Sequence, residues 1–471
     1  MINERKSYME EAEIVELYEL HYSDLKLLSS GSGSGSSSTQ ELERLETIKT
    51  SIMEALGPNG PGLLSICGLT NASILRRNLL PLARNLALLN PDHRNRIFKE
   101  HNLGSDVSLK NPDRNVSSFA MQLRYEQGLE STQNNASSRV GGLTDSDQDH
   151  VDVDMTRHLP DYEYKNLGNT FKELGFCMME LGLRLARICD RAIGGQELEQ
   201  SLLESRTAKG RLIHYHSTPE NITLKEAGRK RGFSKNLDNH RRDWEHCMKS
   251  EQVQTKRANM DTNCHEVGFR GTHSNLWQQW HYDYGVFTVL TDPLFILSSY
   301  LPGNKREEQY ALSCDQECPS PSGHTYLQIF DPNKNKVRMV KSSPESFIIQ
   351  VGESADIISK GKLRSTLHCV VRPAKLENLS RETFVLFLQP AWSKTFSISD
   401  YPLENCNLDC QCSGVPDAEN QLAEQDSKLT EEIRKIIPPL SLRLTDGMTF
   451  AEFSRETTKQ YYGGGGLQAN K

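Results

Sequence analysis

Short apolar stretches separated by turn residues fill the chain from Gly210 to Leu388. Runs of four to eight residues rich in β-branched and aromatic side chains, bounded by turn formers, are typical of strands. The pattern therefore predicts strands at residues 211–216, 285–290, 295–300, 325–330, 347–351, 355–358, 366–371 and 383–388. Strands of this kind with irregular loops favour a double-stranded β-helix, or jelly roll. The expected fold class is α+β with a mainly β core and packed N-terminal and C-terminal helices.

Helical periodicity is found before and after this strand region. Apolar residues step alternately by four and three at Leu167, Phe171, Leu174, Met178, Leu181, Leu185 and Ile188. They predict an amphipathic helix that packs on the core and ends at the Gly194-Gly195 pair.

Capping boxes mark two further helices. Ser38 and Glu41 precede a helix expected to end at Leu56, and Thr449 and Glu452 open a helix near the C-terminus.

Polar stretches suggest how the chain is divided. Residues 31–38 (GSGSGSSS) have the composition of a flexible linker, and residues 126–157 that of a polar loop. Two insertions, 217–279 and 303–323, interrupt the strand region. The expected organisation is a helical and mixed N-terminal region (1–206) packed on the core, a jelly roll (207–400), and a polar C-terminal segment with a helix (401–471).

Composition narrows the class of protein. The chain has 471 residues, of which 36% are hydrophobic, and a net charge of −7; its mean hydropathy is −0.60. No apolar run approaches the roughly 20 residues that a membrane helix needs. The 11 scattered cysteines are an odd number and suit reduced thiols of the cytosol better than a disulfide framework. We therefore expect a cytoplasmic protein, with the nucleus as an alternative, and no general attraction to nucleic acid.

The candidate chemistry centres on His281 and Asp283, at the head of an apolar run. Side chains two residues apart on a strand point to the same face, so this imidazole and carboxylate should converge. A second histidine would complete the 2-His-1-carboxylate triad of non-haem Fe(II) oxygenases. Because His-x-Asp alone recurs by chance, the interpretation depends on a partner, for which the candidate is His368 in a later predicted strand.

The ordered set of these residues closely resembles a known family. His281-x-Asp283, then His368 within RSTLHCVV (364–371), then Arg381-Glu382-Thr383 resemble the isopenicillin N synthase-like family of Fe(II)/2-oxoglutarate-dependent oxygenases. The resemblance is strong over residues 211–390 and fainter over 55–95.

The resemblance implies a site and a reaction. His281, Asp283 and His368 would bind Fe(II) and leave three positions open, two for 2-oxoglutarate and one for O2. Arg381 would bind the far carboxylate of 2-oxoglutarate through its fixed charge, and Thr383 would add a hydroxyl donor. The products are succinate, CO2 and an oxidised substrate, and ascorbate is a further candidate cofactor. Without the family set, a surface arginine beside a strand would be the better interpretation of Arg381.

Three features depart from the family pattern. Thr383 stands where serine is usual. His216 stands near the place of a tyrosine that often contacts the co-substrate, so the neighbouring Tyr215 becomes the candidate for that contact. The interval from His368 to Arg381 is a few residues longer than usual, which a longer hairpin loop could absorb. None of these departures removes a metal ligand.

We therefore expect an Fe(II)- and 2-oxoglutarate-dependent dioxygenase that oxidises, most simply by hydroxylation, an unidentified small organic substrate. Its expected partners are that substrate and O2, without membrane or nucleic acid, and a monomer is favoured. One alternative is a catalytically silent binding or regulatory protein that retains the fold; another is a family member that does not use 2-oxoglutarate. The intact metal set argues against the first, and Arg381 with Thr383 argues against the second.

Three other features have simpler interpretations. The insertion 217–279 is anchored beside His281 and is expected to act as a lid, with a solvated elaboration as the alternative. Its basic segment 229–231 is diluted by acids, which favours a solvated surface over a nucleic-acid patch. The remaining feature is a set of closely spaced cysteines, for which free thiols are favoured over zinc: Cys314, Cys318, Cys406, Cys410 and Cys412.

Overall fold

The computed structural model describes residues 13–30, 39–124, 163–226, 276–298, 316–373, 375–398, 401 and 437–463. Several sequence predictions lie outside these ranges: the linker at 31–38 with its capping residue Ser38, the loop at 126–157, most of the insertion 217–279, Cys314, Cys406, Cys410 and Cys412. None of the helices within these ranges has the length and apolar character needed to cross a membrane.

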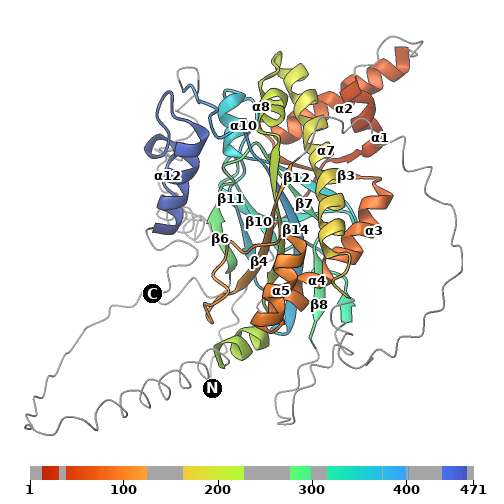
Figure 1. Cartoon of the computed structure of the whole chain (residues 1–471). Coiled ribbons are helices and arrows are strands. Elements are labelled where there is room, and N and C mark those ends of the chain that lie inside the picture. Colours follow the sequence, from red (N-terminus) through yellow and green to blue (C-terminus); the bar gives the residue numbers. More distant parts are fainter. Residues whose placement is uncertain are drawn as a thin grey trace, which may run out of the picture.

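Two β-sheets form the centre of the fold (Figure 1). The smaller sheet has five strands in the order β1-β11-β10-β13-β6. Their bounds are β1 Glu13–Glu16, β11 Lys336–Lys341, β10 Leu327–Asp331, β13 His368–Val371 and β6 Leu276–His281. Strand β1 runs parallel to β11, and the other neighbours are antiparallel.

The larger sheet has nine strands, seven of them in the order β2-β3-β12-β7-β14-β5-β4, with β8 paired to β14 and β9 to β8. Their bounds are β2 Glu19–His21, β3 Leu63–Cys67, β12 Phe347–Val351, β7 Phe287–Thr291, β14 Leu379–Leu388, β5 Thr207–Tyr215, β4 Val116–Arg124, β8 Leu294–Leu297 and β9 Gln316–Cys318. Strand β14 pairs with β5 along one edge and with β7 and β8 along the other. Strands from before residue 207 therefore contribute to both sheets.

The two sheets share an apolar core. It contains Trp277, Leu327, Ile329 and Val370 from the smaller sheet and Ile213, Tyr215, Ile348 and Val385 from the larger one. Because side chains alternate along a strand, Arg381 and Thr383 point to the same inter-sheet space as Val385. Glu382 and Phe384 point to the opposite face, where Phe384 joins the core under the helices.

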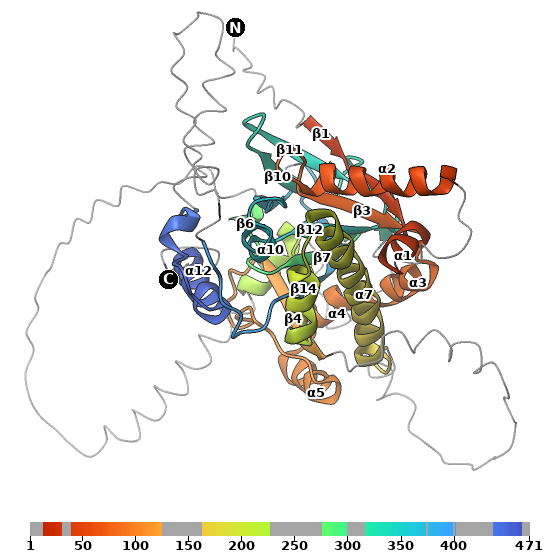
Figure 2. The same cartoon turned by 90° about the horizontal axis from the view of Figure 1, so that it is seen from above.

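Helices cover that opposite face of the larger sheet (Figure 2). The 27-residue helix α7 (Leu167–Ile193) packs on β7 and β14, and α4 (Pro81–Leu88) packs on β4, β5 and β14. The other helices that the structure describes before residue 207 are α1 Tyr22–Ser30, α2 Thr39–Leu56, α3 Thr70–Leu79, α5 Pro91–His101 and α8 Glu197–Ser205. The sequence prediction for α7 is confirmed: the helix ends at Gly194, whose φ of 87° is left-handed.

Most predicted strands are confirmed with shifted ends, but the strand predicted at 355–358 is wrong. These residues belong to helix α10 (Glu353–Ile358). The three apolar residues within 355–358 are too few to be assigned by their periodicity, and the first turn of α10 carries Glu353 and Asp356, which favour a helix N-terminus.

The predicted insertions also contain strands. β6 begins inside the expected insertion 217–279, and β9 lies inside the expected insertion 303–323. Because β6 ends at His281, Asp283 lies beyond the strand rather than on it, which corrects the sequence prediction.

The C-terminal segment is attached to α10 by a buried ion pair. Helix α12 (Phe450–Gly463) follows the short 3-10 helix η5 (Leu440–Leu442). The predicted capping box is confirmed, because the N–H of Thr449 donates to Oε2 of Glu452 at 2.9 Å. Just before it, Arg443 is 1% exposed and binds both carboxylate oxygens of Glu353, with Nη1 2.8 Å from Oε2.

Replacing Arg443 with Met should lower the free energy of unfolding by about 3–5 kcal/mol, because Glu353 then keeps a buried charge without its partner. Chemical denaturation followed by circular dichroism measures the loss. The exposed pair of Lys341 and Glu16 supplies the control, since Lys341→Met should leave the midpoint unchanged. Equal midpoint shifts in the two variants would contradict this assignment.

Candidate metal centre

The pairing of β6 with β13 sets two histidines opposite each other. His281 ends β6 and His368 begins β13, and the two are direct partners in the antiparallel register. Their ring centroids are 4.2 Å apart. Asp283 turns back toward both rings, with Oδ1 3.7 Å from Nε2 of His281 and Oδ2 3.8 Å from Nε2 of His368. The structure thus brings together the three residues that the sequence predicted as ligands.

The three side chains fit a metal ion. One ligand atom from each lies within 4.8 Å of the other two, and all three residues are buried. Ligand atoms that bind one ion at about 2.1 Å lie about 3.0–3.5 Å apart, so small side-chain movements would close the set around an ion. Two imidazoles and one carboxylate are the donors that suit Fe(II) while leaving other positions open.

Backbone carbonyls determine which imidazole nitrogen is available. Nδ1 of His281 lies 2.8 Å from the carbonyl oxygen of Gln279, and Nδ1 of His368 lies 3.0 Å from that of Thr366. Because a carbonyl can only accept, Nδ1 carries the proton and Nε2 presents its lone pair toward Asp283. Burial and the neighbouring His368 lower the pKa of His281, so this ring is neutral near pH 7, as a metal ligand must be.

Side-chain amides contact both rings. Nε2 of Gln278 lies 2.9 Å from Nε2 of His281, and the side-chain amide of Gln350 lies against the ring of His368. The hydroxyl of Tyr215 donates to Oε1 of Gln278 at 2.8 Å. Gln278 therefore links the metal centre to the strand pair β5–β14, and an ion on His281 would take the place of one amide contact.

The turn between β12 and α10 positions the carboxylate ligand. The N–H of Glu353 donates to the carbonyl oxygen of Asp283 at 2.8 Å. A Cβ on Gly352 would come within 2.2 Å of the carbonyl oxygen of Gly285 and 3.0 Å of that of Asp283. Any side chain at position 352 would therefore push the Asp283 segment away, and only glycine permits this approach.

A hydroxyl holds the carboxylate from the other side. Oγ1 of Thr288, on β7, donates to Oδ2 of Asp283 at 2.6 Å. Thr288→Val removes this hydrogen bond at nearly constant volume and should weaken Fe(II) binding by about 10–100-fold, the usual effect of losing such a support. Competition with a chelator under anaerobic conditions measures the change. Thr288→Ser keeps the hydroxyl and should bind Fe(II) normally, whereas equal losses in both variants would point to packing instead.

Arg381 is buried in the inter-sheet space without an acidic partner. It is 3% exposed; its Nε donates to the carbonyl oxygen of Thr325 at 3.0 Å, and its guanidinium lies 5.1 Å from the ring centre of Tyr215. Within the described ranges no carboxylate lies at ion-pair distance from it. A buried charge without a counter-ion is unfavourable, so this guanidinium suits an anionic ligand. Its burial excludes the alternative of a surface arginine.

The other two predicted co-substrate residues lie in the same interior. Tyr215 is the direct partner of Arg381 in the β5–β14 register. Thr383 is 1% exposed, and its Oγ1 donates to the carbonyl oxygen of Thr291 at 3.4 Å. Tyr215 is thus brought next to Arg381 and, through Gln278, to the metal centre. The Thr383 hydroxyl bonds to the neighbouring strand instead of to Arg381.

The supporting residues Gln278, Thr288 and Gln350 were missed by the sequence analysis. A polar residue on a strand usually marks the solvent face. Gln350 carried the one usable signal, because it stands in β12, whose other residues are all apolar, and all five residues of that strand are buried. Such a residue must have a polar partner in the core.

No protein-family model and no curated protein matches the sequence. Among solved structures, a full-length Neurospora crassa protein in complex with alpha-KG and 5-formyluracil is similar at 13% identity and a TM-score of 0.46, covering 96% of this chain and 99% of that one. JOX2 in complex with 2OG, Fe and JA is similar at 12% identity and a TM-score of 0.40, covering 82% and 78%. The dioxygenase for auxin oxidation of rice is similar at 12% identity and a TM-score of 0.39, covering 80% and 83%. Sequence identities and TM-scores this low carry no argument about the function of this chain.

Proposed function

We propose that the protein is an Fe(II)- and 2-oxoglutarate-dependent dioxygenase that oxidises, most simply by hydroxylation, a small organic substrate. The observation that carries the proposal is the meeting of two kinds of group in one buried interior. His281, Asp283 and His368 converge as an iron-type donor set, and Arg381 offers a buried positive charge without an acidic partner. A metal chelated by a keto acid whose far carboxylate binds an arginine matches both requirements.

The proposal extends to the fold and its division. The two facing sheets are interpreted as the jelly roll of the isopenicillin N synthase-like family. Residues 207–400 would form the catalytic unit, with 1–206 and 401–471 packed around it and with strands β1–β4 completing its sheets.

The side chains divide the work. Nε2 of His281, Nε2 of His368 and the Asp283 carboxylate would hold the ion from one side and leave its other positions open. Bound Fe(II) supplies the redox chemistry that couples cleavage of 2-oxoglutarate to oxidation of the substrate. Arg381 would bind the far carboxylate through charge-assisted hydrogen bonds, with the ring of Tyr215 orienting its guanidinium.

The reaction balances with O2 as the oxidant. Oxidative loss of CO2 from 2-oxoglutarate supplies two electrons, and the substrate C–H bond supplies two more, which together reduce O2. One oxygen atom ends in succinate and the other in the hydroxyl of the product. The apolar side chains shared by the sheets limit the access of water to the reacting atoms.

Formation of succinate tests the activity. Full-length protein with Fe(II), 2-oxoglutarate and ascorbate in air should release succinate slowly even without the true substrate. The rate should exceed that of a protein-free control. A folded protein that binds Fe(II) and 2-oxoglutarate but releases no succinate with any added substrate would instead be a binding or regulatory protein that retains the site.

A further inference from the structure

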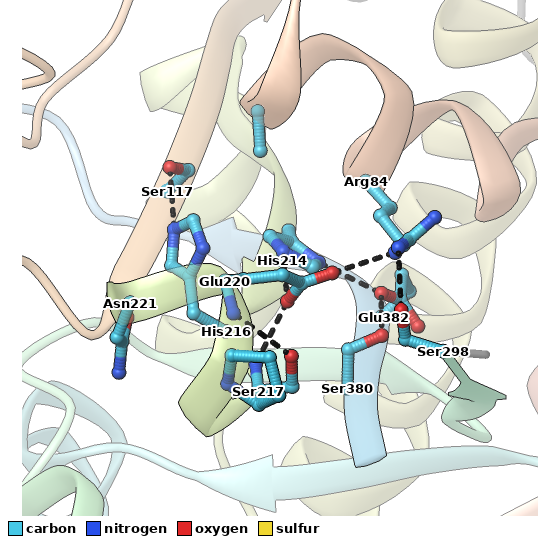
Figure 3. A network of polar contacts seen from close by, with 12 residues as sticks. Arg84, Ser117, His214, His216, Ser217, Glu220, Asn221, Ser298, Ser380 and Glu382 are labelled. Carbon is cyan, nitrogen blue, oxygen red and sulfur yellow. Dashed lines mark hydrogen bonds and ion pairs between the residues drawn. The ribbon is translucent and has the colours of Figure 1, made fainter. Parts of the chain in front are cut away.

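A second cluster of buried metal-binding side chains lies on the helix-facing side of the larger sheet (Figure 3). His214 and His216 flank Tyr215 at the end of β5, and Glu220 follows in the next helical turn. The two imidazoles are fully buried and Glu220 is 5% exposed. One ligand atom from each residue lies within 4.8 Å of the other two, and Nε2 of His214 is 3.2 Å from Oε2 of Glu220. Because neighbours along a strand point to opposite faces, the sheet separates this cluster from Tyr215.

Each imidazole makes a hydrogen bond through one nitrogen, and Nε2 of His214 also lies at ion-pair distance from Glu220. Nδ1 of His214 lies 2.7 Å from Oε1 of Glu382 on β14, and Nε2 of His216 lies 2.9 Å from Oγ of Ser117 on β4. The other two nitrogens, Nε2 of His214 and Nδ1 of His216, have no hydrogen bond within the described part of the chain. Histidines that bind a metal show this arrangement, in which the nitrogen remote from the ion bonds to a carboxylate or another polar group.

A charge network explains part of the cluster without a metal. Nε of Arg84 donates to Oε1 of Glu220 at 2.7 Å, and the backbone N–H of Ser217 donates to Oε2 of Glu220 at 2.8 Å. Burial alone would lower the pKa of His214, but Glu220 and Glu382 raise this pKa to about 9. An imidazolium between two glutamates therefore accounts for this ring. It leaves Nδ1 of His216 unexplained, because buried polar atoms are almost always paired.

We propose that His214, His216 and Glu220 form a second, structural metal site for a divalent cation of the zinc class. Two imidazole nitrogens and a carboxylate oxygen are donors that Zn2+ binds, and a water would complete a four-coordinate shell. Ligand atoms at about 2.0–2.1 Å from a tetrahedral ion lie about 3.3 Å apart, close to the 3.2 Å between His214 and Glu220. The site requires neither iron nor 2-oxoglutarate, so this proposal is independent of the proposed function.

The position of the site gives the ion a structural role. It ties the end of β5 to the helical segment around Glu220, which begins the insertion 217–279. At the other end of that insertion, Nε1 of Trp277 donates to the carbonyl oxygen of His216 at 2.8 Å. On the inner face of the same strands lie Tyr215 and Arg381. A bound ion would therefore fix both the base of the insertion and the strand pair that carries the candidate co-substrate residues.

Cobalt binding to full-length variants tests the site. Asp283→Ala, made metal-free, serves as the background because it removes the candidate iron site. Co2+ should add one equivalent with the visible absorption of a tetrahedral ion, and Zn2+ should displace it. The further change His216→Gln keeps a polar group that reaches toward Ser117 but removes the nitrogen at Nδ1, and it should abolish this equivalent. Binding elsewhere on the chain is common to both variants and cancels in the difference.

Equal Co2+ binding by the two variants would overturn the proposal, as would the absence of tetrahedral absorption in Asp283→Ala. Circular dichroism establishes that each variant is folded. Should the double variant fail to fold, Ser117→Ala in the same background decides the matter. It leaves the three ligands in place but frees the His216 ring, which should weaken Co2+ binding at least about tenfold. An unchanged affinity would assign the cluster to the charge network alone.

Discussion

Replacing Asp283 with Ala should abolish both Fe(II) binding and turnover of 2-oxoglutarate while the protein stays folded. The change leaves two imidazoles at the centre and removes its only carboxylate ligand. A site with two ligands cannot retain iron against dilution, and 2-oxoglutarate would lose the ion that it chelates. Two measurements test this expectation: the iron content of the desalted protein, and the rate at which the protein releases succinate.

The fold should survive because the Asp283 carboxylate supports the centre rather than the core. Its side-chain hydrogen bond goes to Thr288, and the strands around it are held by their backbone pairing and by the inter-sheet apolar core. Asp113→Ala supplies a matched control, because Asp113 lies on an exposed loop, where its side chain is 50% exposed and pairs with Lys225. Full iron occupancy and activity in Asp283→Ala would refute the assignment of this ligand.

Replacing Arg381 with Ala should weaken 2-oxoglutarate binding at least tenfold and leave Fe(II) bound. Truncating one member of a buried charged pair costs on the order of 2–5 kcal/mol, and about 1.4 kcal/mol corresponds to tenfold in affinity. Iron should stay because Arg381 contacts Tyr215 and a backbone carbonyl and none of the three ligands. Equilibrium binding of 2-oxoglutarate to the iron-loaded protein measures the effect.

A conservative variant separates charge from geometry at this position. Arg381→Lys keeps the positive charge but loses the planar pair of donors that matches a carboxylate, so its affinity should fall between those of the native protein and Arg381→Ala. If all three proteins bind 2-oxoglutarate equally, Arg381 has another partner.

The fold could be predicted where the strands are apolar and regular. β12 was predicted with its observed ends because turn residues bound a run of side chains that are all apolar except Gln350. The helix α7 was predicted from its stripe and its terminal glycine. The prediction at 355–358 failed because so short a segment, with three apolar residues, fits a strand as well as a helix, and the deciding contact is distant in sequence. Glu353, at the start of α10, pairs with Arg443 ninety residues later.

The candidate site, like the fold, could be predicted from the sequence only in part. The positions of His281 and His368 followed from a motif, and the β6–β13 register then sets them face to face. Gln278 and Thr288 could not be found, although their partners His281 and Asp283 are close in sequence, because only the folded chain turns these side chains toward the metal centre. His216 was judged a departure from a family pattern that places a tyrosine there. The structure instead places it in the second cluster with His214 and Glu220, which the sequence did not reveal.

The most direct test of the central proposal is anaerobic addition of Fe(II) and then 2-oxoglutarate to the metal-free protein, followed by visible absorption. A metal-to-ligand charge-transfer band should appear only when both are present, because it requires 2-oxoglutarate to chelate an iron held by His281, Asp283 and His368. The same additions to Asp283→Ala should give no band. The absence of a band in the native protein, or a band of equal intensity in Asp283→Ala, would contradict the proposed site and the proposed function together.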